Sequence, residues 1–132
     1  MPRLALRPGL LAALLTLVAF PACEDDHDDD GTPSGATCPQ DSTLTWENFG
    51  QAFMDTYCNR CHGSSVKGAD RQGAPSDHNF DTRELVQEMI DHIDETSAAG
   101  PKITNTAMPI GAPTPTDEER RKLGEWLACD AP

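Results

Sequence analysis

The chain has 132 residues, which is room for one domain, and 22 acidic against 10 basic residues give it a net charge of −12 at pH 7. A chain this acidic is a poor candidate for binding nucleic acid, because that function needs a basic face. Protein partners with a basic or neutral surface are the better expectation.

The first 22 residues are predicted to be an export signal peptide. Arg3 and Arg7 form a basic start, and an uncharged apolar run follows over residues 10–20. This run is shorter than the roughly 20 residues that a membrane-spanning helix needs, and its length is typical of the apolar part of a secretory signal. We therefore expect the protein in the cell envelope of a bacterium.

The residues after the signal indicate how the protein is held there. Ala22-Cys23 resembles the end of the lipobox of bacterial lipoproteins, which implies a lipid on Cys23 and attachment to a membrane. Without that lipid the protein would be periplasmic and free. Six acids crowd residues 24–30, so residues 23–37 are predicted to be an acidic flexible tether and residues 38–132 the folded domain.

The domain is predicted to be all-α, because no alternating strand pattern occurs in it. Three helices are expected from their capping signals. Thr45 would cap a helix from Trp46 to about Tyr57. Asp81 and Glu84 are spaced as a capping box for a helix that ends near Thr96, and Thr116 and Glu119 for one that ends near Ala128. The polar residues 64–79 are expected to form a long loop.

The most specific motif is Cys58-Asn59-Arg60-Cys61-His62, which has the spacing of a c-type haem attachment site. Two intervening residues let both thiols reach neighbouring vinyl groups, and the adjacent histidine then lies under the ring and binds the iron. A redox-active dithiol is an alternative, but no strand precedes the motif. Half of a zinc site is another, but no second ligand pair with zinc spacing follows.

Around this motif the chain resembles the class I cytochrome c family. Gly50 lies eight residues before Cys58, Gly63 follows the histidine, and Leu123 and Trp126 match the pattern of the family's last helix. The resemblance implies a small cytochrome c fold, with three or more helices wrapped around one covalently bound haem c. It also implies that the first and last helices cross where the glycine allows a close approach.

Several residues are candidates for the sixth iron ligand. Met108 stands before Pro109 in a loop rich in Gly and Pro, as the ligand does in the family, and is the leading candidate. Met54 and Met89 are better explained by helix and core positions, while His78 or His92 would make a bis-histidine site. The family also implies that the carbonyl of Pro75 accepts a hydrogen bond from His62.

The remaining cysteines form one pair. With Cys58 and Cys61 assigned to haem and Cys23 to lipid, Cys38 and Cys129 remain at opposite ends of the domain. In an oxidising compartment they are expected to form a disulfide.

The function that these features predict is a monohaem electron carrier, and not an enzyme, with iron held by His62 and Met108. The alternatives are a haem-based redox or ligand sensor and a small haem peroxidase, both of which need a sixth ligand that dissociates.

Overall fold

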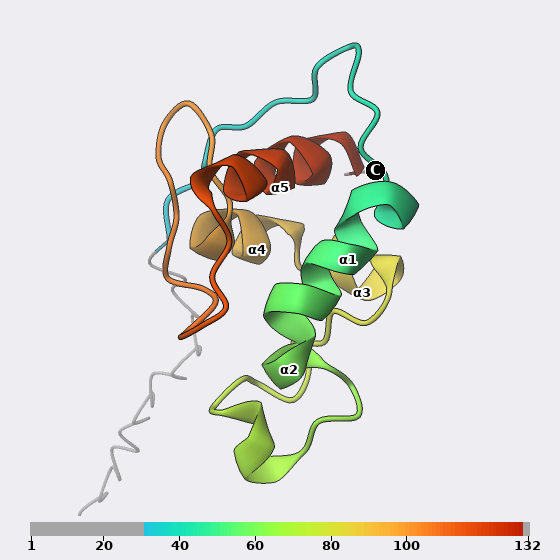
Figure 1. Cartoon of the computed structure of the whole chain (residues 1–132), viewed down its shortest axis with the longest axis vertical. Coiled ribbons are helices and arrows are strands. Elements are labelled where there is room, and N and C mark those ends of the chain that lie inside the picture. Colours follow the sequence, from blue (N-terminus) through green and yellow to red (C-terminus); the bar gives the residue numbers. More distant parts are fainter. Residues whose placement is uncertain (1–30, 131–132) are drawn as a thin grey trace, which may run out of the picture.

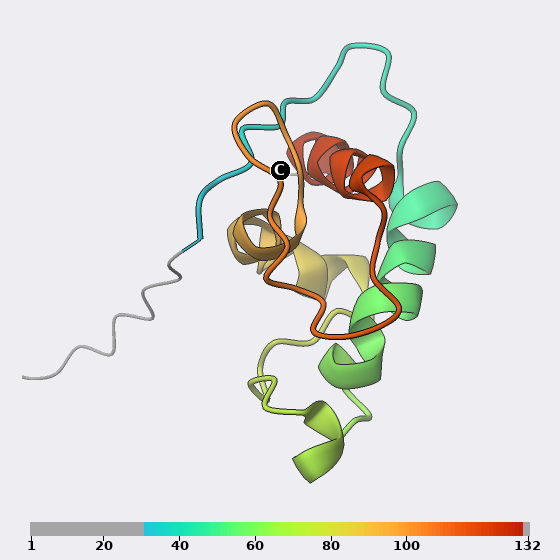
Figure 2. The same cartoon turned by 60° about the vertical axis from the view of Figure 1, so that its left-hand side comes forward.

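The structure is a computed structural model and describes residues 31–130. The expected signal peptide, Cys23 and the acidic residues 24–30 lie outside this range. The all-α prediction is confirmed, because residues 31–130 form helices and no strand, apart from an isolated antiparallel bridge between Ala99 and Thr104. The last helix lies beside the upper part of the first helical segment in both views, with shorter helices below it (Figures 1 and 2).

The first helical segment runs from Trp46 to His62 and carries the whole Cys58–His62 motif. It is helical throughout but changes winding along its length, in the order η1 (Trp46–Gly50), α1 (Gln51–Phe53), η2 (Met54–Cys58) and α2 (Asn59–His62). Thr45 caps it as predicted: Thr45 Oγ1 accepts from the backbone N–H of Asn48 at 3.3 Å, and Asn48 Oδ1 accepts from that of Thr45 at 2.8 Å. The segment continues beyond Tyr57, the predicted end.

The second predicted helix is broken into two, α3 (Arg83–Gln87) and α4 (Ile90–Ser97). Met89 interrupts it with φ −126° and ψ 21°, outside the helical region. The predicted cap at Asp81 is wrong. Thr82 caps α3 by accepting from the backbone N–H of Leu85, whereas the Asp81 carboxylate accepts from Ser64 N at 2.7 Å and so ties the helix to the preceding loop.

The last helix, α5 (Asp117–Asp130), begins with the predicted capping box. Thr116 Oγ1 accepts from Glu119 N at 3.2 Å, and Glu119 Oε2 accepts from Thr116 N at 2.8 Å. Residues 64–79 form the expected loop, which contains one short 3-10 helix, η3 (Gly68–Arg71).

The crossing of the first segment and α5 depends on Gly50. A Cβ added there would lie 2.5 Å from the Trp126 ring, a distance that no side chain tolerates. This close approach is the one that the family resemblance implies. The core around it consists of buried apolar side chains from the first helical segment, α3, α4 and α5, together with Phe80 and Ala98. Its largest members are Trp126, Met54, Leu123, Leu127 and Val86.

The last part of the expected tether is packed against the domain, and here the prediction of a flexible coil is corrected. Ser34 is completely buried, and its N–H and hydroxyl donate to the two carboxylate oxygens of Asp94 at 2.7 and 2.5 Å. The Thr32 carbonyl accepts from the Asn105 side chain at 2.8 Å. These polar contacts, and not apolar burial, order a segment whose composition is that of a linker, so the ordered domain begins before Cys38.

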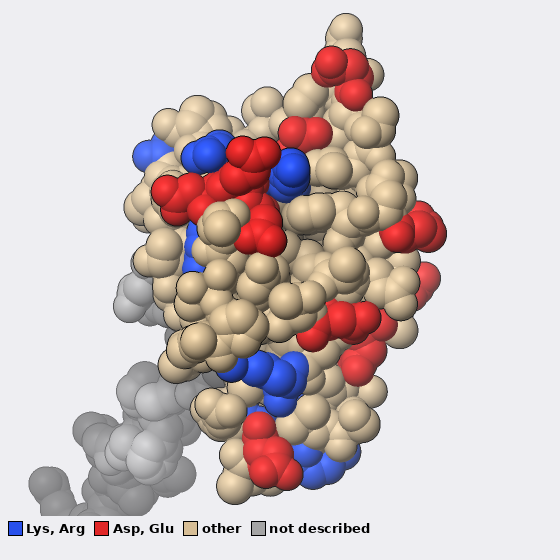
Figure 3. Space-filling model, in the orientation of Figure 1, with Lys and Arg blue, Asp and Glu red and all other residues tan. Residues whose placement is uncertain are grey.

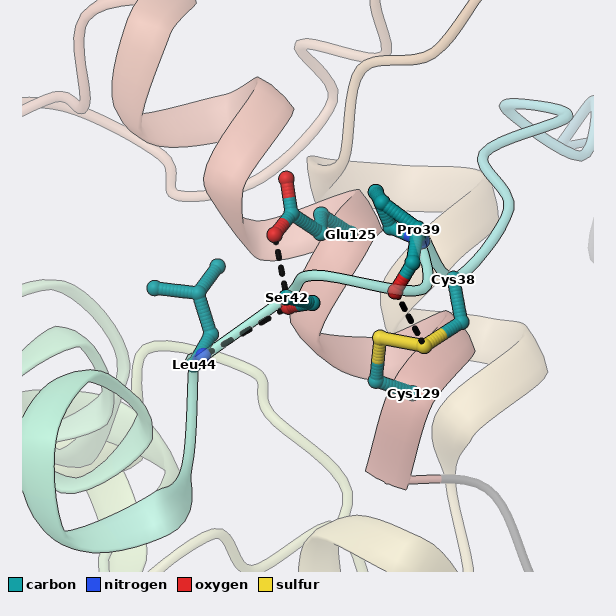
Figure 4. The surroundings of a disulfide bond; sticks show 6 residues. All are labelled: Cys38, Pro39, Ser42, Leu44, Glu125 and Cys129. Carbon is teal, nitrogen blue, oxygen red and sulfur yellow. Dashed lines mark hydrogen bonds between the residues drawn. A yellow bond between two sulfur atoms is a disulfide. The ribbon is translucent and has the colours of Figure 1, made fainter.

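The Cys38–Cys129 disulfide is present and joins this N-terminal segment to the last turn of α5 (Figure 4). The two Cα atoms lie 4.7 Å apart, and 91 positions separate them in the sequence. Next to the bridge, the Ser42 hydroxyl donates to Glu125 of α5 at 2.6 Å (Figure 4). The chain before the first helix is therefore held to α4 through Ser34 and to α5 through Cys38 and Ser42.

Candidate functional site

A cavity of about 300 Å³ gathers nearly all the residues that the sequence singled out. The end of the first helical segment, the loop after η3, α4 and the loop between α4 and α5 each form part of its wall. Its lining includes Cys58, Cys61, His62, Pro75 and Met108, and also the alternative ligands His78 and His92.

His62 is held in one orientation at the wall of this cavity. It is 8% exposed, and its Nδ1 lies 3.0 Å from the backbone carbonyl oxygen of His78. A carbonyl oxygen only accepts, so Nδ1 carries the proton and Nε2 keeps the lone pair that a metal can bind. The Phe80 ring stacks on the imidazole at 4.6 Å. Burial lowers the pKa of His62, against the opposing effect of its bond to His78, and so favours the neutral ligating form.

The carbonyl that holds His62 is not the predicted one. The Pro75 carbonyl accepts instead from Arg71 Nη2, which also donates to the His78 carbonyl at 3.0 Å. His78, and not Pro75, therefore fixes the imidazole, because the turn between these two residues places the His78 carbonyl next to His62. Pro75 lines the cavity, but among the described residues it makes no hydrogen bond to His62.

Arg71 organises this loop and was missed by the sequence analysis. It is 6% exposed and donates to carbonyl oxygens at both ends of the loop, including those of Gly63 at 3.1 Å and Ala74 at 3.0 Å. Its Nη1 also donates to Asn79 Oδ1 at 3.0 Å. An arginine that pairs with backbone carbonyls leaves no spacing pattern in the sequence, so only the structure identifies it.

Cys58 and Cys61 both carry free thiols at the cavity wall. Burial raises the pKa of the Cys58 thiol to about 12, although Arg60 and Arg120 act to lower it. A redox-active dithiol needs a thiol with a lowered pKa. The environment of Cys58 therefore does not activate this thiol as the nucleophile of such a dithiol.

Of the methionines in residues 31–130, Met108 is the one that lines the cavity. Met54 is fully buried in the core, and Met89 packs against the core from outside, as their sequence positions predict. The Met108 backbone is fixed at both polar groups: its N–H donates to Thr96 O at 2.9 Å, and its carbonyl accepts from Arg120 Nη1 at 2.8 Å.

His78 and His92 lie next to one another in the same cavity. Their rings are 4.8 Å apart, and the His78 ring lies 6.5 Å from that of His62. Because the His78 carbonyl is also the partner of His62, His78 belongs to the wall that carries His62, whereas His92 comes from α4 and Met108 from the loop after α4. His92 and Met108 are thus the candidate ligands whose support is independent of His62.

The residues at this cavity fit a covalently held haem. Two thiols at the required spacing, an oriented neutral imidazole and a thioether from another segment all line one space. Within residues 31–130, no group of three or more His, Cys, Asp or Glu side chains is placed to hold a metal ion. Within the same residues no helix is long and apolar enough to cross a membrane.

Comparisons with known proteins identify no relative. No family model matches the chain, and no match was found among curated proteins or solved structures.

Proposed function

We propose that the protein is a monohaem c-type cytochrome that carries electrons in the cell envelope. The observation that carries this proposal is the meeting of Cys58, Cys61, His62 and Met108 in one cavity, although Met108 comes from a loop 46 residues beyond His62. The helical fold would then wrap around the haem, as it does in the family that the sequence resembles.

Each residue has a separate task in this proposal. Cys58 and Cys61 hold the haem through thioether bonds, and the Nε2 lone pair of His62 binds the iron while His78 fixes the other nitrogen. The Met108 thioether occupies the sixth position and, as a soft ligand, favours ferrous iron. A bound haem would supply an iron that gains and loses one electron.

Saturated ligation is what makes a carrier the better proposal than an enzyme or a ligand sensor. A peroxidase or a sensor needs a sixth position that opens to a substrate or a gas. Met108 is held through its backbone N–H and its carbonyl, which favours a ligand that stays in place.

The partners are proposed to be redox proteins with a basic or neutral surface. Acidic groups gather on the face drawn in Figure 3 over the start of α5, where Asp117, Glu118 and Glu119 lie, and recur along the rest of the face among fewer basic groups. Attachment to a membrane through Cys23 remains part of the proposal and concerns residues outside the described range.

Spectroscopy of the haem-loaded protein tests this function. The wild-type ferric protein should show the weak red charge-transfer band of a sulfur–iron bond, and the ferrous protein should bind carbon monoxide only slowly. Met108→Ala should lose the band, bind carbon monoxide rapidly and have a lower reduction potential, because the soft ligand has gone. A wild-type protein that binds carbon monoxide at once would favour the sensor or the peroxidase. An unchanged spectrum in Met108→Ala would favour His78 or His92 as ligand.

A further inference from the structure

Two arginines contact the backbone of the loop that carries Met108, which we call the Met108 loop (residues 98–116). Arg120 reaches it from the first turn of α5, and Arg60 reaches it from the haem-attachment motif, where it stands between the two cysteines. Within this loop they contact the carbonyls of Asn105, Met108 and residues 110–112.

Arg120 ties the Met108 loop to the end of α4. It is 3% exposed, and its Nη1 lies 2.7 Å from the carbonyl oxygen of Ser97 and 2.8 Å from those of Asn105 and Met108. Burial lowers the pKa of Arg120, with Asp117 acting in the opposite direction. The carbonyl groups replace the water that a buried guanidinium loses, and in doing so they fix three points of the chain.

Arg60 ties the same loop to the segment that carries Cys58, Cys61 and His62. Its guanidinium donates to the carbonyls of Ile110 and Ala112, and it lies 3.3 Å from that of Gly111. Fifty positions separate Arg60 from Ile110 in the sequence. The planar, forked guanidinium suits several carbonyls at once, which a lysine ammonium on its flexible stem does less well.

These contacts anchor the loop at two places, the carbonyl of Met108 and the carbonyls two to four residues later. The anchors join the loop to α5 on one side and to the attachment helix on the other. A shift of the loop that carries Met108 away from the cavity breaks these charge-assisted hydrogen bonds.

We infer that Arg60 and Arg120 are positioning residues for the sixth ligand, and that they set how often Met108 leaves the iron. The inference rests on the proposed function, because it concerns a bond from Met108 to haem iron. The two arginines act through the backbone of the Met108 loop and need no contact with the iron or with the thioether.

The test compares carbon monoxide binding to the ferrous haem-loaded protein, because the gas binds only after Met108 dissociates. Arg60→Ala and Arg60→Lys should both bind it about tenfold faster than wild type. A factor of ten corresponds to about 1.4 kcal/mol, which is near the net contribution of one hydrogen bond to a charged group. The red charge-transfer band should weaken in both variants.

Arg121→Ala is the control for charge, since Arg121 is an exposed cation next to Arg120 on α5 and its loss changes the net charge as much as the loss of Arg60 does. It should bind carbon monoxide at the wild-type rate. Arg120→Lys, which keeps the buried charge but has a shorter side chain that does not bring its nitrogen to the position of Nη1, should resemble the Arg60 variants. If it does not fold, the Arg60 pair decides the question, because Arg60 is only partly buried.

Two results would overturn the inference. If both Arg60 variants bind carbon monoxide at the wild-type rate, Arg60 does not restrain Met108. If Arg60→Ala is faster but Arg60→Lys matches wild type, the effect comes from charge near the iron and not from the contacts with the loop. A wild-type protein without the red band contradicts the proposed function instead, so the two failures are distinguishable.

Discussion

The Nδ1 atom of His62 lies 3.0 Å from the carbonyl oxygen of His78, and Arg71 donates to that same oxygen at 3.0 Å. The orientation of the imidazole therefore depends on a loop that a buried arginine holds together. In metal sites, partners of this kind fix the tautomer and the direction of the ligating nitrogen.

Arg71→Ala should therefore destabilise the protein and disturb the site. We expect the free energy of unfolding to fall by about 3 kcal/mol, because the substitution leaves several buried carbonyls without a donor. Urea denaturation followed by circular dichroism measures this loss. Lys67→Ala, which removes an exposed cation from the same loop, should change stability by less than about 0.5 kcal/mol. Equal effects of the two substitutions would show that Arg71 does not organise the loop.

The Cys38–Cys129 disulfide should contribute to stability without touching the site. The bridge closes a loop of 92 residues, since 91 positions separate the two cysteines. Loop-closure entropy then predicts a loss of about 4–5 kcal/mol when both are changed to serine. Thermal and urea unfolding measure the loss, and the visible spectrum of the folded protein should not change. A double variant as stable as wild type would contradict this account.

Gly50→Ala tests the crossing of the first helical segment and α5. The added Cβ would meet the Trp126 ring at 2.5 Å, so the helices must separate or the ring must move. Overpacking of this kind costs about 1–3 kcal/mol, whereas Gly→Ala in an exposed helix is stabilising. Gln51→Ala, at the exposed neighbouring position, is the control and should be nearly neutral. A stabilised Gly50→Ala variant would refute the close approach.

The Tyr57–Glu119 contact predicts a pH dependence. Tyr57 donates to Glu119 at 2.9 Å, and the pKa of Glu119 is lowered mainly by the hydrogen bond from the Thr116 backbone, then by the Thr116 and Tyr57 hydroxyls. A carboxyl whose pKa is lower in the folded state stabilises the fold above its unfolded pKa of 4.5. That stabilisation is lost as the pH falls through the folded value.

Glu119→Gln should accordingly flatten the acid side of the stability curve. The difference in Tm between wild type and variant should be largest near neutral pH and shrink below about pH 4.5. Scanning calorimetry at a series of pH values measures it. Glu118→Gln is the control, because that exposed neighbour has Lys122 as its partner on the helix surface. Parallel curves for wild type and Glu119→Gln would contradict the assignment.

Local signals in the sequence predicted the helices that have clear caps. Thr45 and the Thr116–Glu119 pair cap the helices expected of them, because a capping side chain bonds the backbone two or three positions away. The break at Met89 is not marked by a Gly or a Pro in the sequence. Thr82 caps α3 in place of Asp81 because the Asp81 carboxylate accepts a hydrogen bond from Ser64. A tertiary contact therefore decided the choice of cap.

The sequence predicted the Cys58–His62 motif and Met108, but not the contacts that hold these residues in place. Cys58, Cys61, His62 and Met108 share a cavity as expected. The interactions that hold them run through backbone carbonyls, which every residue possesses, so nothing in the sequence distinguishes His78 from Pro75 as the partner of His62. For the same reason Arg120, and the buried Ser34 within a linker-like composition, were not foreseen.

Covalent attachment of haem is the central claim, and one measurement tests it directly. The protein is produced together with a c-type maturation system, denatured in acidic acetone and analysed by intact mass. The account predicts that one haem remains with the polypeptide, and that changing both Cys58 and Cys61 to alanine abolishes this retention. Haem that passes entirely into the solvent, or a polypeptide that never acquires it, would contradict the account.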